Sequence, residues 1–486
     1  MTRALLIDAV PGEVRAALIE DGEVAEIHID REGHESLVGN IYVGRVAAVE
    51  PSLQAAFVTL PGTSLPGFLS AKHVGALVED GDARRIERVV HQGELLLVEA
   101  TRDPVGDKGP GLTTLVTLPG RLLVYHPFRR DNVLSGAIRE EAQRARLEDA
   151  ARQAADAVGD GGFVIRTAAQ SAAIADILDE ARALRDRWLG LKARAAAADT
   201  PACLQTDLPP AARILRDLAR PGLSAITVDG RALHAEARAH LQRGQPELLP
   251  LLEVHAGHTP LFEAAGIEAA IDSLLETRLD LDGGGWITVE TGEALTVIDV
   301  NSGDGTAESS REQTAFTTNL RAAPLIARQI RLRDIGGMIL IDFIHMESPK
   351  HRDRVLDTLR EALAGDRSPA SVLGWSRMGL CEVSRRRGRE ALPDFLAGRR
   401  DIAAQRRRRT AESTGYDVLR RLRAEAAASP GARLAVTAHP AVIAWLEARP
   451  EALSDIAGKP PLLTADGRRP LDRPEIQPHI RAQTDE

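Results

Sequence analysis

The 486-residue sequence predicts a multidomain α/β protein, and three observations lead to this prediction. The chain is long for a single hydrophobic core, so about two to four domains are expected. Residues 38–118 show short strand patterns between closely spaced Gly and Pro turns, whereas much of the remaining chain alternates helical and strand patterns. Two apolar runs, "LTVIDVN" at 295–301 and "MILIDF" at 338–343, flank one helical segment, as in a βαβ unit.

The composition argues against several classes of protein. No stretch approaches a membrane span, and an acid at position 8 interrupts the apolar N-terminus too early for a signal peptide, so a cytoplasmic protein is expected. The two cysteines, Cys203 and Cys381, support neither a disulfide framework nor a CxxC metal site. The net charge of −9 gives the whole molecule no electrostatic preference for nucleic acid.

The N-terminal region predicts a small β-meander followed by a small closed barrel of the OB type over residues 38–118. Expected strands are 5–8, 15–20 and 23–29 in the meander, and 39–46, 55–60 and 66–69 in the barrel.

Three aromatic residues gather in the barrel segment, although the whole chain contains only 8 Phe, 3 Tyr and 4 Trp. Tyr42, Phe57 and Phe68 therefore form a candidate base-stacking platform, with Lys72 and Lys108 available for phosphates. The alternative is that the two phenylalanines fill the core of the barrel.

Residues 136–198 are rich in Ala and Arg and predict helices, interrupted by a strand in the run "GDGGFVIRT" at 159–167. That strand ends in Arg166 and Thr167, a donor pair that suits a phosphate, although an ordinary surface arginine is the alternative. Residues 201–280 alternate helix and strand, and the clearest strand is 224–229.

The two acidic runs carry the strongest functional indication. Each run is typical of a buried strand, where a carboxylate is costly unless a cation or hydrogen-bond donors compensate its charge. As parallel neighbours, the strands would bring their carboxyl ends to one edge of the sheet, where open α/β sheets keep their sites. Asp299, Asn301 and Asp342 offer only oxygen ligands, which suit Mg²⁺ or Mn²⁺ better than Zn²⁺. The alternative is that the aspartates merely cap the ends of their strands.

The segments around the second acidic run predict further helices. The capping box "SSRE" at 309–312 opens a helix that continues to Arg333, and another helix is expected at 350–364. Residues 385–409 are rich in arginine. These arginines are either phosphate ligands or part of a solvated face. A helix at 415–428, a strand at 433–437 and a helix at 441–447 predict a small α/β module, followed by an extended Pro-rich tail beyond residue 458.

Long motifs in this chain resemble those of the ribonuclease E/G family of bacterial single-strand endoribonucleases. The motifs are "EALTVIDVNSG", "TAFTTNL", "ARQIRLRDIGGMILIDFI" and "MGLCEVSRRR" in the DNase I-like subdomain, "GNIYVGRVAAVEPSLQAAFVTL" and "GFLSAKHV" in the S1-type barrel, and "VIRTA" in the 5′-sensor region. The resemblance covers nearly the full chain.

The resemblance implies a fold of RNase H-like and DNase I-like α/β subdomains, with an inserted S1-type OB-fold β-barrel and a small C-terminal α/β domain. The implied domains are a first RNase H-like segment (1–36), the S1-type RNA-binding domain (37–119), the 5′-sensor region (120–205), a second RNase H-like segment (206–280), the DNase I-like catalytic subdomain (281–398), an arginine-rich linker without zinc ligands (399–414) and the small C-terminal domain (415–486).

The resemblance also implies an activity and its residues. The family hydrolyses single-stranded RNA in rRNA and mRNA processing or decay, and leaves a 5′-phosphate and a 3′-hydroxyl. The implied site residues are Asp299, Asn301 and Asp342 for catalysis, Asp299 and Asp342 for Mg²⁺, Phe57, Phe68 and Lys108 for RNA, and Gly120, Val124, Arg166, Thr167 and Arg385 for a 5′-monophosphate.

This sequence departs from the family pattern at three places. The CPxC zinc motif is replaced by "RRGRE" at 386–390, so no structural zinc is expected and a homodimer would need another contact. Where the family has paired arginines beside the 5′-sensor, this chain has Gly136 and Ala137, which predicts weak sensing of the 5′-end. His345 replaces an acid, and 303–305 departs from the usual sequence, so the metal affinity is open.

Two other functions remain open. A catalytically weak or inactive RNA-binding scaffold would keep the same fold without turnover. A phosphoesterase acting on a small substrate would use the same acids but would leave the barrel unexplained.

Overall fold

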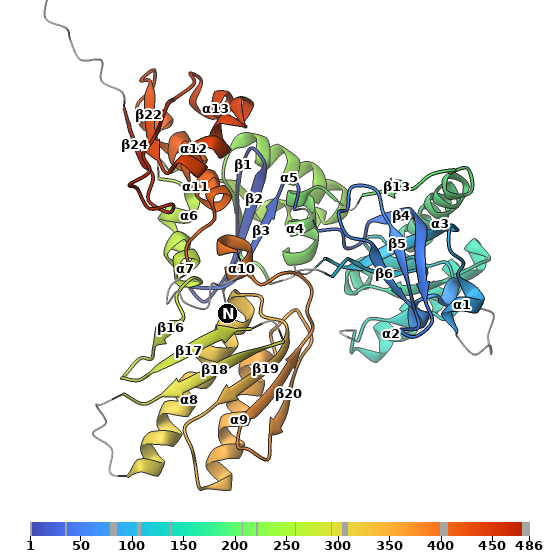
Figure 1. Cartoon of the computed structure of the whole chain (residues 1–486). Coiled ribbons are helices and arrows are strands. Elements are labelled where there is room, and N and C mark those ends of the chain that lie inside the picture. The colour runs from blue at the N-terminus through green and yellow to red at the C-terminus, as the bar shows by residue number, and fades with distance from the viewer. Residues whose placement is uncertain are drawn as a thin grey trace, which may run out of the picture. The chain divides into compact units, whose positions relative to one another are not determined.

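The computed structural model describes residues 2–34, 36–77, 85–104, 108–136, 138–206, 208–219, 222–257, 259–292, 294–303, 310–398 and 407–478 (Figure 1). The chain forms two compact units: unit 1 is Met1–Glu35, Pro210–Leu241 and Glu247–Glu486, and unit 2 is Ser36–Pro209 and Gln242–Pro246. The predicted multidomain α/β class is confirmed. Ala137, Asp304, Gly305, Ser309 and most of the expected linker, 399–406, lie outside the described residues.

Unit 1 begins with the predicted meander, which belongs to a larger sheet. Strands β1 (Arg3–Val10), β2 (Glu13–Glu20) and β3 (Glu23–Arg31) are antiparallel, and β1 also pairs in parallel with β14 (Ala225–Val228), giving the order β15-β14-β1-β2-β3 with β15 at Leu252–Val254. Leu5 and Ile7 are fully buried in a core shared with α4 (Pro210–Leu218) and α5 (Arg231–Gly244). The short helices α6 (Leu261–Ala264), α7 (Ile267–Ser273) and α10 (Leu392–Ala397) contribute to a second core on this sheet.

Unit 2 contains the predicted closed barrel of five strands. The strands are β4 (Ile41–Glu50), β5 (Ala55–Thr59), β6 (Gly67–Ser70), β8 (Gly111–Thr113) and β7 (Leu95–Arg102), and a pairing between β4 and β7 closes the ring. Helix α1 (Ile86–Val89) contributes Ile86 to the barrel core, and β13 (Ala202–Gln205) pairs with β4. This closed arrangement is consistent with an OB-like fold.

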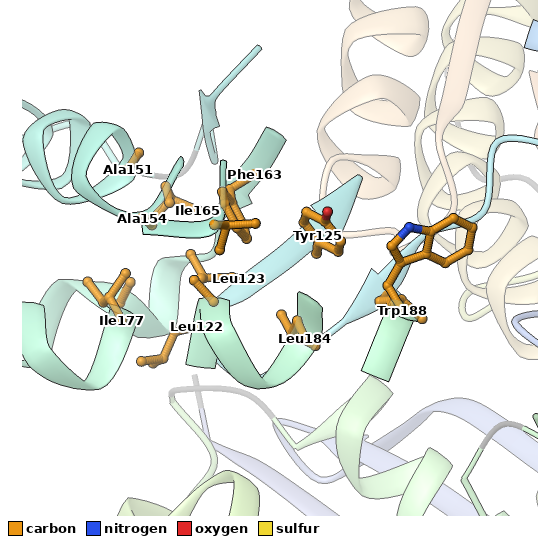
Figure 2. Packing of buried hydrophobic residues seen from close by; sticks show 14 of the residues in the cluster. Leu122, Leu123, Tyr125, Ala151, Ala154, Phe163, Ile165, Ile177, Leu184 and Trp188 are labelled. Atoms are coloured by element: carbon orange, nitrogen blue, oxygen red, sulfur yellow. The ribbon is translucent and has the colours of Figure 1, made fainter. Parts of the chain in front are cut away.

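The rest of unit 2 packs two helices on a four-stranded sheet. The order is β11-β12-β10-β9, with β9 at Leu118–Pro119, β10 at Leu123–His126, β11 at Val133–Leu134 and β12 at Gly162–Ile165. Figure 2 shows Phe163 and Ile165 of this sheet among side chains of α2 (Glu141–Val158) and α3 (Ile174–Ala196). The strand predicted between two helices is therefore confirmed as β12.

The two acidic runs lie in a six-stranded sheet of unit 1. Its order is β16-β17-β18-β19-β21-β20, with β16 at Arg278–Asp280, β17 at Trp286–Thr291, β18 at Leu295–Asn301, β19 at Gly337–Asp342, β20 at Ala370–Trp375 and β21 at Cys381–Arg385. Helices α8 (Arg311–Leu332) and α9 (Pro349–Leu363) lie along one face of this sheet (Figure 1). Strands β18 and β19 are parallel neighbours, so the predicted βαβ unit is confirmed.

Helix α8 begins differently from the predicted capping box. Ser310 is the N-cap, and its hydroxyl accepts a hydrogen bond from the backbone N–H of Gln313. Glu312 instead accepts the backbone N–H groups of Glu347 and Ser348. The carboxylate of Glu312 thus ties the start of α8 to the segment after β19.

The C-terminal module, residues 411–478, has its own sheet, and its hydrophobic core also includes Val10 of β1. Helices α11 (Ala411–Ala428), α12 (Pro440–Glu447) and α13 (Pro450–Ala457) accompany the sheet β23-β22-β24, in which β22 is Leu434–Ala438. The predicted extended tail contains two strands that the sequence did not predict, β23 (Leu462–Ala465) and β24 (Glu475–Pro478), and both pair with β22. Leu463 and Ile476 pack on the module's core, which gives these strands their driving force.

Buried charges join α11 to the N-terminal sheet. Arg420 donates from Nε to Asp8 Oδ2 at 2.7 Å and also pairs with Glu13. Arg423 Nη2 lies 2.8 Å from Asp8 Oδ1 and 2.6 Å from Asp229 Oδ2. Because buried charges must be paired, these contacts make α11 an integral element of the folded core of unit 1.

Among the described residues, no helix combines the length and the apolar character needed to cross a membrane.

Candidate active site

The structure brings the two predicted aspartates together. In the parallel pair β18 and β19, Asp299 and Asp342 are direct partners in the register. Adjacent strands lie about 4.8 Å apart and side chains of register partners point to the same face of a sheet, so both carboxylates rise side by side at one end of the strands.

The face that carries these carboxylates is opposite to the one on which α8 and α9 pack. Ile298, Val300 and Ile341, which flank the aspartates in sequence, are buried against α8 and α9, whereas Asp299 is half-buried and Asp342 is exposed. Val297 and Met338 on the open face are 40% and 58% exposed. The predicted strands are therefore buried on one face only, and the cost of placing carboxylates on the other face is smaller than in a fully buried strand.

Asn301 completes the predicted group. Its Nδ2 donates a hydrogen bond of 2.8 Å to Asp299 Oδ2. This bond holds the orientation of the carboxamide and leaves its carbonyl oxygen free of that contact. Asp299 and Asn301, two residues apart on β18, present their side chains to the same face.

The chemistry of these donors fits a hard divalent cation. No group of three or more His, Cys, Asp or Glu side chains with metal-binding geometry occurs in the portion of the chain that the structure describes. Mg²⁺ retains several waters and is commonly held by one or two carboxylates, so a pair of aspartates such as Asp299 and Asp342 has the chemistry to hold it.

Two residues of α8 fix the loop that follows Asp342. The sequence analysis missed Asn319 and assigned Glu312 only to the capping box. Asn319, fully buried, donates from Nδ2 to Ile344 O at 2.8 Å and accepts from Ile344 N at 3.0 Å. Glu312 accepts N–H of Glu347 at 2.8 Å and N–H of Ser348 at 3.2 Å, and pairs with His351 Nδ1 at 2.6 Å. The backbone hydrogen bond from Glu347 is the main cause that lowers the pKa of Glu312. The sequence did contain one indication of the role of Asn319, because it is a polar residue on the apolar side of a predicted helix.

Replacing Asn319 with Ala is expected to loosen the loop that follows Asp342. The N–H and C=O of Ile344 lose their partner, which costs about 1–3 kcal/mol of stability, and misplacing a catalytic group by about 1 Å lowers turnover by up to about 100-fold. Steady-state kinetics on RNA should show a reduced kcat with a nearly unchanged KM. Thr317→Ala on the same helix is the control, and a kcat equal to that of this control would contradict the clamping role.

Phe57 and Phe68 stand together on the barrel, as predicted for a stacking platform. They are register partners on β5 and β6, their ring centroids are 6.0 Å apart, and both are half-buried outside the barrel core. Tyr42 is instead buried in that core, where Asn40 Nδ2 donates to its hydroxyl. The prediction that Tyr42 belongs to the stacking platform is therefore wrong. Lys72 and Lys108 are exposed.

Four of the residues predicted for 5′-phosphate sensing lie on or beside the hairpin formed by β9 and β10 of unit 2. Val124 on β10 faces Val164 on β12, and Arg166 and Thr167 follow β12 directly. Arg166 Nη1 donates to Gly120 O at 2.7 Å. The hairpin is held by Glu180 of α3, whose carboxylate accepts the N–H groups of Leu122 and Leu123.

Arg385, the fifth predicted sensor residue, is a buried ion-pair residue of β21 in unit 1. Its guanidinium donates to Asp366 at 2.6 and 3.1 Å, to Asp334 at 2.7 Å and to Ile335 O at 3.0 Å. With most of its donors engaged, it is not available to a phosphate in this arrangement. Its contacts therefore give the sensing assignment no support.

Other arginines of the run 385–409 also pair with carboxylates. The pairs are Arg389 with Asp30, Arg407 with Asp394 and Arg409 with Asp272. Each of these guanidinium groups joins two segments of unit 1. These three arginines are therefore neither phosphate ligands nor part of a merely solvated face in this structure. His345 is exposed in the loop after Asp342.

Comparisons with known proteins give one consistent result. The sequence matches the family described as "Ribonuclease E/G family" over residues 117–388. It is 37% identical over 451 residues to "Ribonuclease G" of Salmonella typhimurium (strain SL1344) and equally to that of Escherichia coli (strain K12), covering 91% of this chain and 92% of each relative. It is also 32% identical over 395 residues to "Ribonuclease E" of Haemophilus influenzae, covering 80% of this chain and 42% of that protein.

Proposed function

From the premise that this chain belongs to the ribonuclease E/G family, we propose that it is a metal-dependent endoribonuclease. It hydrolyses internal phosphodiester bonds of single-stranded RNA in rRNA or mRNA processing or decay, leaving a 5′-phosphate and a 3′-hydroxyl. The observation that carries the proposal is the register pairing of Asp299 with Asp342 on an open sheet face.

The domain assignment belongs to the proposal. We assign the sheet β15-β14-β1-β2-β3 to the RNase H-like subdomain and the six-stranded sheet that carries the aspartates to the DNase I-like subdomain. The five-stranded barrel is the S1-type domain, and the following helical region of unit 2 is the 5′-sensor region. These assignments rest on the segments from which each sheet is built.

Asp299 and Asp342 hold Mg²⁺ or Mn²⁺ in the proposed mechanism. An ion held there would supply Lewis-acid stabilisation of the phosphodiester and would activate the attacking water. Asn301, oriented by its bond to Asp299, positions the phosphate that is attacked. Asn319 and Glu312 act through the backbone and keep Asp342 in place.

The barrel, which precedes the catalytic subdomain in the sequence, binds the RNA strand. Phe57 and Phe68 offer two adjacent rings for base stacking, and Lys108 contacts a phosphate. Gly120, Val124, Arg166 and Thr167 form the 5′-monophosphate pocket. A homodimer of this chain would need a contact other than a shared zinc ion, because the run 386–390 contains no cysteine.

Recognition of the 5′-end is expected to be weak. Gly136 and Ala137 supply no guanidinium where the family pattern has two arginines, and a hydrogen bond to a charged group contributes about 1.5–3 kcal/mol. RNA with a 5′-monophosphate should therefore be cleaved at most about ten-fold faster than the same RNA with a 5′-hydroxyl. A preference of a hundred-fold or more would contradict this prediction.

One assay tests the function and the 5′-end together. A 3′-labelled single-stranded RNA carrying either end is incubated with Mg²⁺, Mn²⁺ or EDTA, and internal products are expected only with a metal. An exonuclease that requires a 5′-phosphate should degrade the downstream product. Binding without product across both metal titrations would favour the scaffold, and phosphate release from small esters alone would favour the phosphoesterase.

A further inference from the structure

A tryptophan lies directly beside the proposed catalytic group. Trp286 on β17 is the register partner of Asn301, and Thr288 is the partner of Asp299. Register partners share a face of the sheet, so Trp286 stands on the same open face as Asn301, Asp299 and Asp342.

The local backbone explains this placement. Gly283, Gly284 and Gly285 all have positive φ and turn the chain between β16 and β17. A Cβ atom on Gly285 would lie 2.4 Å from Asn301 O, so only glycine permits this close approach of the turn to β18. A Cβ at Gly303 would lie 3.6 Å from the Trp286 ring, which places the indole against the chain that leaves Asn301.

Arg278 covers the indole. Its guanidinium carbon lies 4.0 Å from the ring centroid, and its side chain also pairs with Asp280 at 3.2 Å. The side chains of Arg278 and Asp280 are 57% and 79% exposed, so this ion pair contributes little to stability. A planar cation thus occupies the ring face at the solvent boundary without being locked there.

The three other tryptophans have evident packing roles. Trp188 is buried in the core of unit 2, Trp375 packs on the core beneath the six-stranded sheet, and Trp445 contacts Gly415 and Tyr416 in the C-terminal module. Trp286 belongs to none of the buried clusters. A half-buried indole with an exposed arginine beside it is the combination on which bases stack in proteins that bind single-stranded nucleic acid.

We propose that Trp286 and Arg278 form a base-binding subsite for a nucleotide that flanks the scissile phosphate. A base stacks on the indole in the place that Arg278 takes in the free protein, and the guanidinium moves to that nucleotide's phosphate. The inference rests on the proposed function, because it requires RNA over Asp299 and Asn301. The competing explanation is that the pair only stabilises the turn between β16 and β17.

Kinetics with two substitutions separate these explanations. Trp286→Leu removes the stacking surface and should raise KM for a single-stranded RNA at least about five-fold, with kcat within about two-fold, because stacking contributes about 1–3 kcal/mol per base. Trp286→Phe keeps an aromatic face and should retain most of the affinity. A purely structural role would instead lower the melting temperature with both substitutions and leave KM unchanged, which would overturn the proposal.

Fluorescence gives a second readout that does not depend on cleavage. In the Asp342→Asn background, a short single-stranded RNA should quench the tryptophan emission, and most of this quenching should disappear with Trp286→Phe. Trp445→Phe is the matched control, because Arg449 lies 3.9 Å from the Trp445 ring in the same kind of contact. Quenching lost equally in the control, or undiminished without Trp286, would overturn the subsite. Full activity of Asp342→Asn would refute the proposed function while leaving this binding test valid.

Discussion

Replacing Asp342 with Asn is expected to reduce Mg²⁺-dependent cleavage of single-stranded RNA by about 1,000-fold, or about 4 kcal/mol of transition-state stabilisation. The substitution keeps the size of the side chain and removes the charge that pairs with Asp299 in holding the ion. Because the residue is exposed, the fold should tolerate the change. RNA affinity, measured by filter binding, should remain close to that of the wild type.

Asp357→Asn is the matched control for this experiment. Asp357 lies on α9 in an exposed pair with Arg360, so its loss should leave cleavage within about two-fold of the wild type. If Asp342→Asn cleaved RNA as fast as this control in Mg²⁺, the assignment of the metal site would have to be abandoned.

Replacing Arg420 with Met is expected to lower the free energy of unfolding by about 3–5 kcal/mol, since it leaves buried carboxylates without their main partner. Arg420 bonds to Asp8 and Glu13, and all three side chains are buried. Urea unfolding followed by tryptophan emission should show the loss, because Trp445 packs on Tyr416 of the same helix. Arg421→Met, on the exposed side of α11, should change stability by less than about 0.5 kcal/mol.

The same cluster predicts a pH dependence. Burial by itself would raise the pKa of Asp8, but Arg420, Arg15 and Arg423 hold it far below its usual value, and Arg420 and Arg31 do the same for Glu13. A depressed folded-state pKa contributes stability that is complete above the unfolded pKa of about 4 and is lost as the pH falls below it. The difference between the wild type and Arg420→Met should therefore be largest near pH 7 and should shrink below about pH 4. An equal difference at pH 7 and pH 3 would contradict this account.

Local patterns were sufficient to predict the elements that carry the candidate site. The β-branched runs ending in Asp299 and Asp342, with a helical repeat between them, admit few arrangements other than parallel neighbours. The closed barrel was predicted from strand spacing for a similar reason, since short strands with close turns pair with their sequence neighbours.

The features that the sequence did not reveal depend on distant contacts. Val297 and Met338 are apolar although they lie on the exposed face, so the sequence did not show which face of the two strands is exposed. Strands β23 and β24 were missed because their Pro-rich surroundings hide a pairing with β22 that only tertiary packing specifies. The contacts of Asn319 and Trp286 are with residues of other segments, and the local hydrophobic pattern of the sequence does not specify such contacts.

The central claim is that Asp299 and Asp342 together hold a divalent ion. X-ray diffraction from crystals grown with Mn²⁺, recorded near the manganese absorption edge, tests it most directly. The account predicts an anomalous peak about 2 Å from a carboxylate oxygen of each aspartate, with waters completing the coordination. A peak that contacts neither carboxylate, or no peak in crystals whose dissolved protein cleaves RNA in Mn²⁺, would contradict it.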